Sequence, residues 1–300
     1  MQTLRIISGS RALDSERERS PEARDFAEEA LVRLALAMGP HSCKLVIIGG
    51  LNPGFLTVSP PVPHLGTTDI DVLLEVGFVH DRDEMDFAWL EEGLRVAAFT
   101  PNPSGYQPWR WYTRIDDRLV KLELICDTYD SPGHELALPG CATVVAQNLK
   151  GPRPALLDAV ERRLEVSSHA LNAFPDAPSH VIVRFAGLGG YVMSKAAAVV
   201  LRGDDKDFYD LTFVLLFNGS GGATGAARAV HAVMKLDDAV AFNSLVTAAL
   251  DMYSKPESRP ARAFAEQMQL SGDATDPQVL AQDAVGAAIA CRRELATLGH

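Results

Sequence analysis

Apolar residues recur at helical spacing in the first regular stretch of the chain. Ser20 is a favourable helix cap and Pro21 suits the first helical turn. Apolar positions then continue through Leu31 and Leu34 until Gly39 interrupts the pattern. The pattern predicts a helix that begins after Ser20 and ends at Gly39. The charged, polar segment before Ser20 is predicted to be loosely packed.

Short β-branched or alternating runs predict strands further along. KLVIIGG (44–50) is a buried strand that ends in two glycines, and TTDIDVLLEV (67–76) returns as a second strand. RWYTRI (110–115) and LVKLELICD (119–127) flank an Asp-Asp-Arg turn and predict a hairpin. The proline-rich stretch 52–66 is predicted to be a long loop without regular helix.

Helical spacing dominates the remainder of the chain. An amphipathic helix is predicted over 83–98, and a short strand over 180–184. Residues 191–201 and 205–217 are predicted to form two helices separated by Gly203, and the Ala-rich segments after them continue as helices.

These elements predict an α+β protein with two parts. Residues 1–150 form a mixed sheet flanked by helices, and residues 151–300 form a mainly helical region that closes a cleft against the sheet. The boundary follows from the change in character after Gly151.

Composition narrows the functional classes. No apolar run approaches the about 18 residues needed to span a bilayer, and the start of the chain has no secretory pattern, so we expect no membrane association. The 4 cysteines are scattered, which favours a reducing cytoplasm over a disulfide framework. A net charge of -11 argues against a broad basic face for long nucleic acid, although a local basic groove stays compatible with it.

The strand residues that carry chemistry are acidic. Asp69 and Asp71 are two apart in a strand, so both carboxylates project from one face and can share divalent cations. Glu123, on the polar face of a later strand, is the candidate third metal ligand, and Asp127 has the same parity and is the alternative. The expected cofactor is Mg²⁺ or Mn²⁺. A lone Asp-x-Asp is also typical of a solvated strand edge.

Nucleotide-binding groups are expected beside these acids. Gly49 and Gly50 allow the backbone to approach phosphate closely, and Thr68 adjoins the first acid. Lys195 and Arg202 are seven apart, so they share a helix face on which two cations could meet a triphosphate.

Two acids of the next helix complete the candidate catalytic group. Asp207 and Asp210 are three apart, and they could orient Lys195 or Arg202, or act as general base toward an acceptor hydroxyl. Without the upstream acids, a surface ion-pair network would be the simpler interpretation. His64 is expected to be a surface or packing residue, although its loop faces the proposed site.

The order of these motifs resembles the nucleotidyltransferase superfamily. IIGG, TTDIDVLLEV and VKLELI are similar to its glycine loop, acidic pair and third strand acid. The stretch YVMSKAAAVVLRGDDKDFYDLTFVL resembles the signature of the AbiEii/AbiGii toxin family, which includes the MenT-type toxins. The resemblance covers about residues 44 to 217. It implies a nucleotidyltransferase-type sheet and a toxin that transfers NMP from a nucleoside triphosphate to RNA, in MenT-type members to the tRNA 3′ acceptor end, with an antitoxin protein as partner.

The chain departs from that pattern between Gly50 and Asp69. The separation is longer than usual and rich in proline, so either the loop bulges outward and returns, or the glycine pair is structural. Two alternatives stay open for the function. One is a nucleotidyltransferase with a protein or small-molecule acceptor, and the other is an inactive nucleotide-binding or antitoxin-like module.

Overall fold

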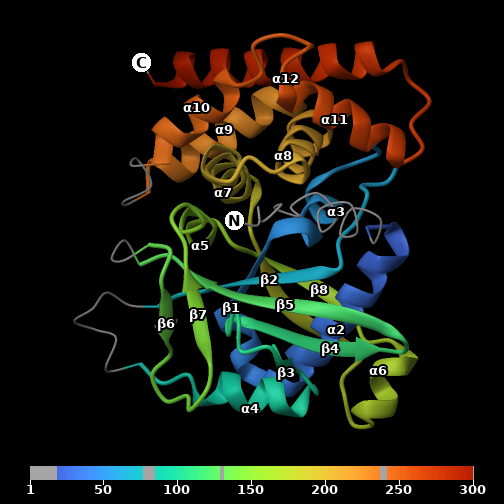
Figure 1. Cartoon of the computed structure of the whole chain (residues 1–300), viewed down its shortest axis with the longest axis vertical. Helices are drawn as coiled ribbons and strands as arrows, with labels where there is room; N and C mark the ends of the chain where they lie inside the picture. Colours follow the sequence, from blue (N-terminus) through green and yellow to red (C-terminus); the bar gives the residue numbers. More distant parts are fainter. Residues whose placement is uncertain (1–18, 77–84, 129–131, 237–241, 300) are drawn as a thin grey trace, which may run out of the picture.

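The computed structural model describes residues 19–76, 85–128, 132–236 and 242–299. A mixed sheet runs through the lower half of the molecule, and helices cover both of its faces (Figure 1). The strands are β1 (Leu45–Ile48), β2 (Asp69–Leu74), β3 (Thr100–Pro101), β4 (Arg110–Ile115), β5 (Arg118–Cys126), β6 (Glu135–Ala137), β7 (Val145–Asn148), β8 (Val160–Glu165) and β9 (His180–Phe185).

The strand order is β3-β4-β5-β2-β1-β9-β8, with β6 and β7 paired beyond one end of β5. β2 is parallel to β5 and antiparallel to β1, so it lies in the middle of the sheet. The sheet is mixed, as the sequence predicted.

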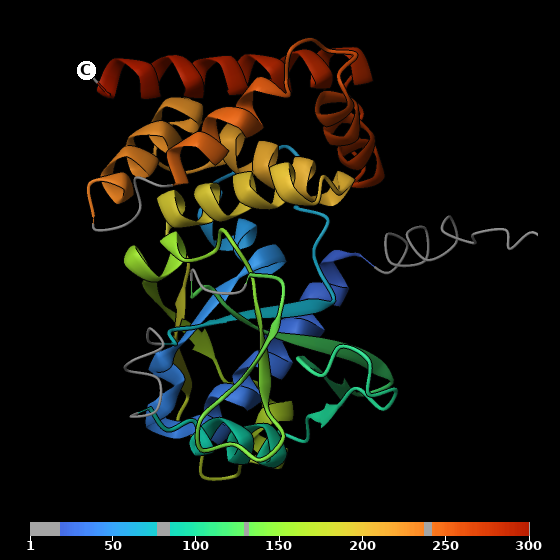
Figure 2. The same ribbon diagram turned by 60° about the vertical axis from the view of Figure 1, so that its left-hand side comes forward.

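The helices are α2 (Pro21–Met38), α3 (Pro53–Leu56), α4 (Ala88–Val96), α5 (Pro154–Leu157), α6 (Ser168–Ala173), α7 (Leu188–Leu201), α8 (Asp205–Phe217), α9 (Gly222–Met234), α10 (Asn243–Asp251), α11 (Arg259–Leu270) and α12 (Pro277–Leu298). Short 3₁₀ turns, η1 (Gly39–Lys44) and η2 (Gly49–Leu51), flank β1. Helices α7 to α12 stack above the sheet in Figures 1 and 2.

The sheet separates two hydrophobic clusters, one on each of its faces. Leu45 and Ile47 of β1 pack with α2 and α4, whereas Val46 and Ile48 join the cluster formed by α7 to α12. Alternate residues of a strand point to opposite faces. Leu73, which has the same parity as the acids of β2, belongs to the cluster on the α7–α12 side, so the acidic face of the sheet looks toward those helices.

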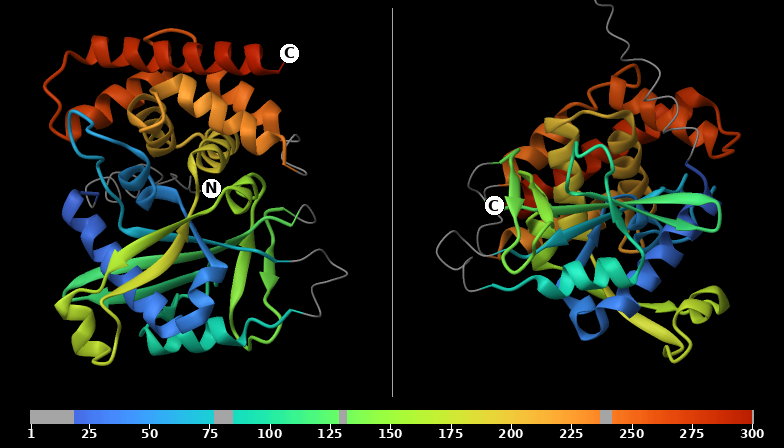
Figure 3. Two further views of the ribbon diagram at one scale, coloured as in Figure 1. Left: turned by 180° about the vertical axis from the view of Figure 1, so that it is seen from behind. Right: turned by 60° about the horizontal axis from the view of Figure 1, so that its bottom comes forward.

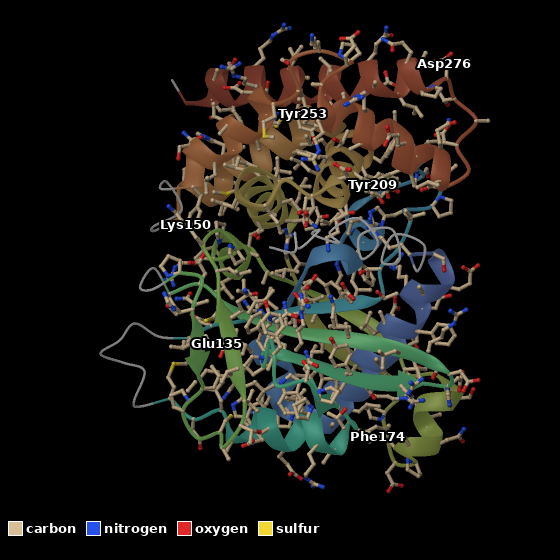
Figure 4. The ribbon with its side chains drawn as sticks, in the orientation of Figure 1. Glu135, Lys150, Phe174, Tyr209, Tyr253 and Asp276 are labelled. Carbon is tan, nitrogen blue, oxygen red and sulfur yellow. The ribbon has the colours of Figure 1, made fainter. Side chains whose placement is uncertain are left out.

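The labelled side chains follow the same division. Tyr209, Tyr253 and Asp276 lie in the upper helical part, while Glu135 and Phe174 lie in the lower part that contains the sheet (Figure 4). Seen from behind, α2 crosses the lower face of the sheet (Figure 3). The helical part therefore forms a roof over the acidic face.

Several sequence predictions of local structure are confirmed. Ser20 caps α2, with its side chain accepting from the backbone N of Ala23, and the helix ends at Gly39. The hairpin turn between β4 and β5 includes Asp116 in the left-handed region, at φ 51°. α8 spans the predicted residues, and Gly203 separates it from α7.

One prediction is wrong and two fall partly outside the described residues. The proline-rich stretch contains helix α3, because Pro53 sits at the first helical position, where a missing N–H costs nothing. The predicted helix 83–98 begins at Ala88, and residues 83–84 lie outside the described part. The segment before Ser20 lies outside it up to residue 18.

The division of the chain at residue 150 stays a prediction. Strands β8 and β9 lie beyond that residue and complete the sheet, so the sheet is built from both predicted parts. In the described part of the chain, no helix is long and apolar enough to cross a membrane.

Candidate active site

The three strand acids lie together because of the register between β2 and β5. Asp69 pairs with Lys121, and Asp71 pairs with Glu123, in the parallel ladder. Residues two apart in a strand share a face, so all four side chains project to the same side of the sheet. The predicted association of Asp69, Asp71 and Glu123 is therefore present in the fold.

Lys121 lies between two of these acids. Its Nζ is 2.9 Å from Asp69 Oδ2 and 3.0 Å from Glu123 Oε1. Arg110 of β4 reaches Glu123 from the other side, with Nε 2.8 Å from Oε1. Thr68 donates its hydroxyl to Asp69 Oδ1 over 3.0 Å. Sequence analysis assigned no role to Lys121, although its parity in the strand was visible.

Asp71 differs from Asp69 and Glu123 in its contacts. Asp71 makes no ion pair within the described residues. Burial, together with repulsion from Glu123 and Asp69, raises the pKa of Asp71 to about 6. Burial also raises the pKa of Asp69, but Lys121 outweighs it and brings that pKa below its usual value. Asp71 is thus the acid of this centre whose charged form is disfavoured, and a bound cation would favour that form.

The glycine pair packs against β2. Gly49 has φ 77°, and a Cβ placed on it would lie 1.8 Å from Asp71 Oδ2. A Cβ on Gly50 would lie 2.7 Å from Thr67 Cβ. Both positions require glycine for close approach to neighbouring side chains. This supports a structural role for Gly49, whereas Gly50 also lines the cavity described below.

The long loop after the glycines reaches the helical part and returns. Thr57 forms an isolated bridge with Asn218 at the end of α8, and the backbone N of Leu65 donates to Tyr209 Oη over 3.0 Å. The loop therefore bulges outward, which was one of the two predicted explanations for its length.

The roof of the site carries a buried ionic network. Lys195 of α7 lies 3.0 Å from Asp207 Oδ1 and 2.7 Å from Asp210 Oδ2. Arg202 binds Asp207 in a bidentate manner, with Nε and Nη2 each 2.9 Å from a carboxylate oxygen. Burial would lower the pKa of Lys195, but Asp210 and Asp207 outweigh it and raise that pKa.

Asp210 has two further partners: Arg19, which the sequence did not indicate, and His64, whose loop was predicted to face the site. Arg19 Nη2 lies 2.9 Å from Asp210 Oδ1 and its Nε donates to Gly66 O. His64 Nε2 lies 3.0 Å from the same Oδ1, while His64 Nδ1 accepts from Gly66 N. A ring nitrogen that accepts from an amide carries no proton, so His64 is neutral and donates through Nε2. Burial lowers the pKa of His64 in agreement with this.

This environment favours a positioning role for the two aspartates. Burial would raise the pKa of Asp210, but Lys195 and Arg19 hold it well below its usual value. Asp207 is fully buried, and its pKa is also lowered because Lys195 and Arg202 outweigh its burial. A carboxylate with a depressed pKa is a poor proton acceptor near neutral pH. Of the two roles predicted for these acids, orientation of Lys195 and Arg202 fits the geometry better.

The sheet and the roof enclose one cleft of about 630 Å³. Its lining includes seven of the predicted site residues besides Gly50: Thr68, Asp69, Asp71, Glu123, Lys195, Arg202 and Asp210. Lys206 and Arg19 add cations to the roof side, and Tyr112 and Arg118 line the hairpin side. Two predicted site residues do not line the cleft: Asp207 contacts Lys195, and Gly49 packs against Asp71. Residues from seven separate segments thus line one cavity.

Asp127 lies elsewhere. Its Oδ2 accepts from the backbone N of Gly151 and of Arg153, at 2.9 Å and 3.0 Å, and the residue is buried. It therefore anchors the chain before α5. Between the two candidate third acids, only Glu123 faces Asp71.

The carboxylates of Asp69 and Asp71 suit a hard divalent cation. Mg²⁺ is commonly held by one or two carboxylates, with substrate phosphates and water as the other ligands. Asp71 is free of ion pairs in the described part and Asp69 lies beside it, which meets that requirement. The described residues contain no group of three acids, cysteines or histidines arranged around one metal position, and Lys121 contacts both Asp69 and Glu123.

Comparison with known proteins adds no assignment. No family model, curated protein or solved structure matches the chain. The resemblance to the AbiEii/AbiGii family accordingly stays a prediction from the sequence motifs, and the functional argument rests on the cleft itself.

Proposed function

We propose that the protein is a Mg²⁺-dependent nucleotidyltransferase that transfers NMP from a nucleoside triphosphate to an acceptor and releases pyrophosphate. The observation that carries this proposal is the pairing of an acidic sheet face with a cationic roof across one cleft. Nucleotidyl transfer requires cations around a triphosphate and carboxylates that hold the metal. The cleft supplies both groups on opposite walls.

Each wall has a distinct part in the proposed reaction. Asp71 and Asp69 would hold the divalent ion, which supplies neutralisation of the phosphate oxygens when bound. Lys206 and Arg202 line the cleft and would bind the triphosphate, and Lys195 is kept charged and in place by its two buried aspartates. Preorganised charges of this kind need no rearrangement at the moment of reaction.

The RNA acceptor, and tRNA in particular, is proposed from the motif resemblance. The cleft has basic and aromatic groups on its hairpin side, namely Arg118, Arg110 and Tyr112, which support an anionic acceptor with stackable bases. The motif resemblance also leads us to propose that the protein is a toxin with an antitoxin partner.

The test is transfer of label. The purified protein is incubated with Mg²⁺, each α-labelled nucleoside triphosphate in turn, and total RNA. We expect label on a tRNA-sized band, and a loss of at least about a hundredfold in Asp69→Asn, because removing one electrostatic group of an active site costs that much. Asp116→Asn is the matched control, since this acid lies exposed in the turn of the neighbouring hairpin.

The arms of the test separate the alternatives. Label on protein would favour the acceptor class of the first alternative. Unchanged transfer in Asp69→Asn would refute the site assignment.

A nucleotide-binding module without catalysis is the second candidate, and one observation favours it. Lys121 contacts both Asp69 and Glu123 through its ammonium, which suits a site that binds nucleotide without a two-metal reaction. Triphosphate binding without pyrophosphate release would support this candidate.

A further inference from the structure

We infer that Lys121 takes the place of one cation in the acidic centre, so that the centre binds a single divalent ion, on the Asp71 side. This inference rests on the proposed metal-dependent function and specifies its metal stoichiometry.

The fold fixes Lys121 in this position. It pairs with Asp69 across the β2–β5 ladder, and it shares its strand face with Glu123, two residues further on. Its ammonium lies 2.9 Å and 3.0 Å from the two carboxylates, and 22% of its side chain is exposed. The lysine is thus held by a central strand pair and by two charge-assisted contacts.

The Lys121 ammonium occupies the place between Asp69 and Glu123 that a second metal ion would take. Two-metal sites place their ions about 3.5–4 Å apart, with carboxylates shared between them. Asp69 Oδ2 and Glu123 Oε1 are the oxygens that contact Lys121. A second ion between these acids would have to displace the ammonium.

The charges of the acidic centre also favour a single divalent ion. Asp69, Asp71 and Glu123 carry three negative charges, and Lys121 and Arg110 return two positive ones. The remaining negative charge lies on Asp71, which has no ion-pair partner within the described residues. One divalent ion more than compensates this charge, and the surplus suits the negative charge of a triphosphate.

Mn²⁺ binding to the purified full chain tests the inference without an activity assay. Free Mn²⁺ is measured by electron paramagnetic resonance during titration, with no nucleotide present. We expect one ion per chain in the wild type and none in Asp71→Asn. Lys121→Met keeps the aliphatic stem and removes the charge, so we expect a second ion and at least about tenfold tighter binding of the first.

Two further variants control the result. Lys235→Met removes an exposed lysine next to α9, outside the cleft lining, and should titrate as the wild type does. Lys121→Arg keeps the charge and should retain one ion, which preserves the test if Lys121→Met fails to fold.

The outcomes separate the inference from the function on which it rests. Two ions in the wild type, or an unchanged stoichiometry and affinity in Lys121→Met, would overturn the role of Lys121 and leave metal dependence intact. Absence of Mn²⁺ binding in every variant, with a triphosphate analogue present or absent, would instead contradict the metal-dependent function itself.

Discussion

Substitution of Asp71 by asparagine should stabilise the metal-free protein at neutral and alkaline pH. The pKa of Asp71 is raised from 3.8 to about 6, first by burial and then by Glu123 and Asp69. A shift of that size corresponds to about 3 kcal/mol of cost for the charged form. Because the carboxylate is partly exposed and shares its charge with neighbours, we expect a gain of about 1–3 kcal/mol in Asp71→Asn.

The sign of the pH dependence follows from the direction of the shift. Between 3.8 and about 6 the folded state binds more protons at Asp71 than the unfolded state does. This contribution to stability is therefore fully present below 3.8 and is lost as the pH rises through about 6. The advantage of Asp71→Asn should be largest above about pH 7 and should vanish below about pH 4.

Urea unfolding with a chelator present, at a series of pH values, measures this difference directly. Added Mg²⁺ gives a second readout, because a ligand at a hundredfold excess over its Kd stabilises the folded state by about 2.7 kcal/mol. Mg²⁺ should therefore stabilise the wild type alone and close the gap. An asparagine variant that is less stable than the wild type, or a gain that is independent of pH, would refute the reasoning.

Three further predictions concern the surrounding structure. Gly49→Ala should cost more than about 1 kcal/mol in thermal unfolding and weaken Mn²⁺ binding, because the added Cβ meets Asp71 at a backbone φ of 77°; unchanged Mn²⁺ affinity would contradict it. Asp127→Ala should lower the urea midpoint, by about 1–3 kcal/mol of stability, because it removes the acceptor of the backbone N–H groups of Gly151 and Arg153. It should leave Mn²⁺ affinity unchanged; a loss of Mn²⁺ binding would reinstate this acid as a metal ligand. Asp207→Asn should lower the free energy of unfolding by about 3–5 kcal/mol, because the buried Lys195 loses one of its carboxylate partners. Adding Lys195→Met to that variant should recover part of the lost stability, as measured by chemical denaturation.

The acidic face could be predicted from the sequence because it depends on local parity. Asp69 and Asp71 are two apart in a run flanked by buried residues, and Glu123 alternates with Leu122 and Leu124 in the same way. Only the pairing of β2 with β5 was needed to bring the two patterns together, and that pairing is a long-range property. The ionic role of Lys121 depends on the same register, so its parity alone did not reveal it.

The parts that sequence analysis missed lack a local signal. β8 reads as a charged segment, VERRLE, because it is an outer strand that buries only Leu164 fully. Arg19 and His64 lie outside the motifs, and their contacts with Asp210 join positions far apart in the chain. Helix α3 is a single turn in a proline-rich loop, where composition favoured irregular structure.

The contacts of Asp210 also bear on how the cleft receives a substrate. Its carboxylate links three segments of the chain, since Lys195 comes from α7, Arg19 precedes α2, and His64 lies in the loop between β1 and β2. Separation of the two walls would remove partners from a carboxylate of which only 3% is exposed. Under the proposed function, the cations and carboxylates on the two walls would meet a nucleotide at separations that these contacts already set.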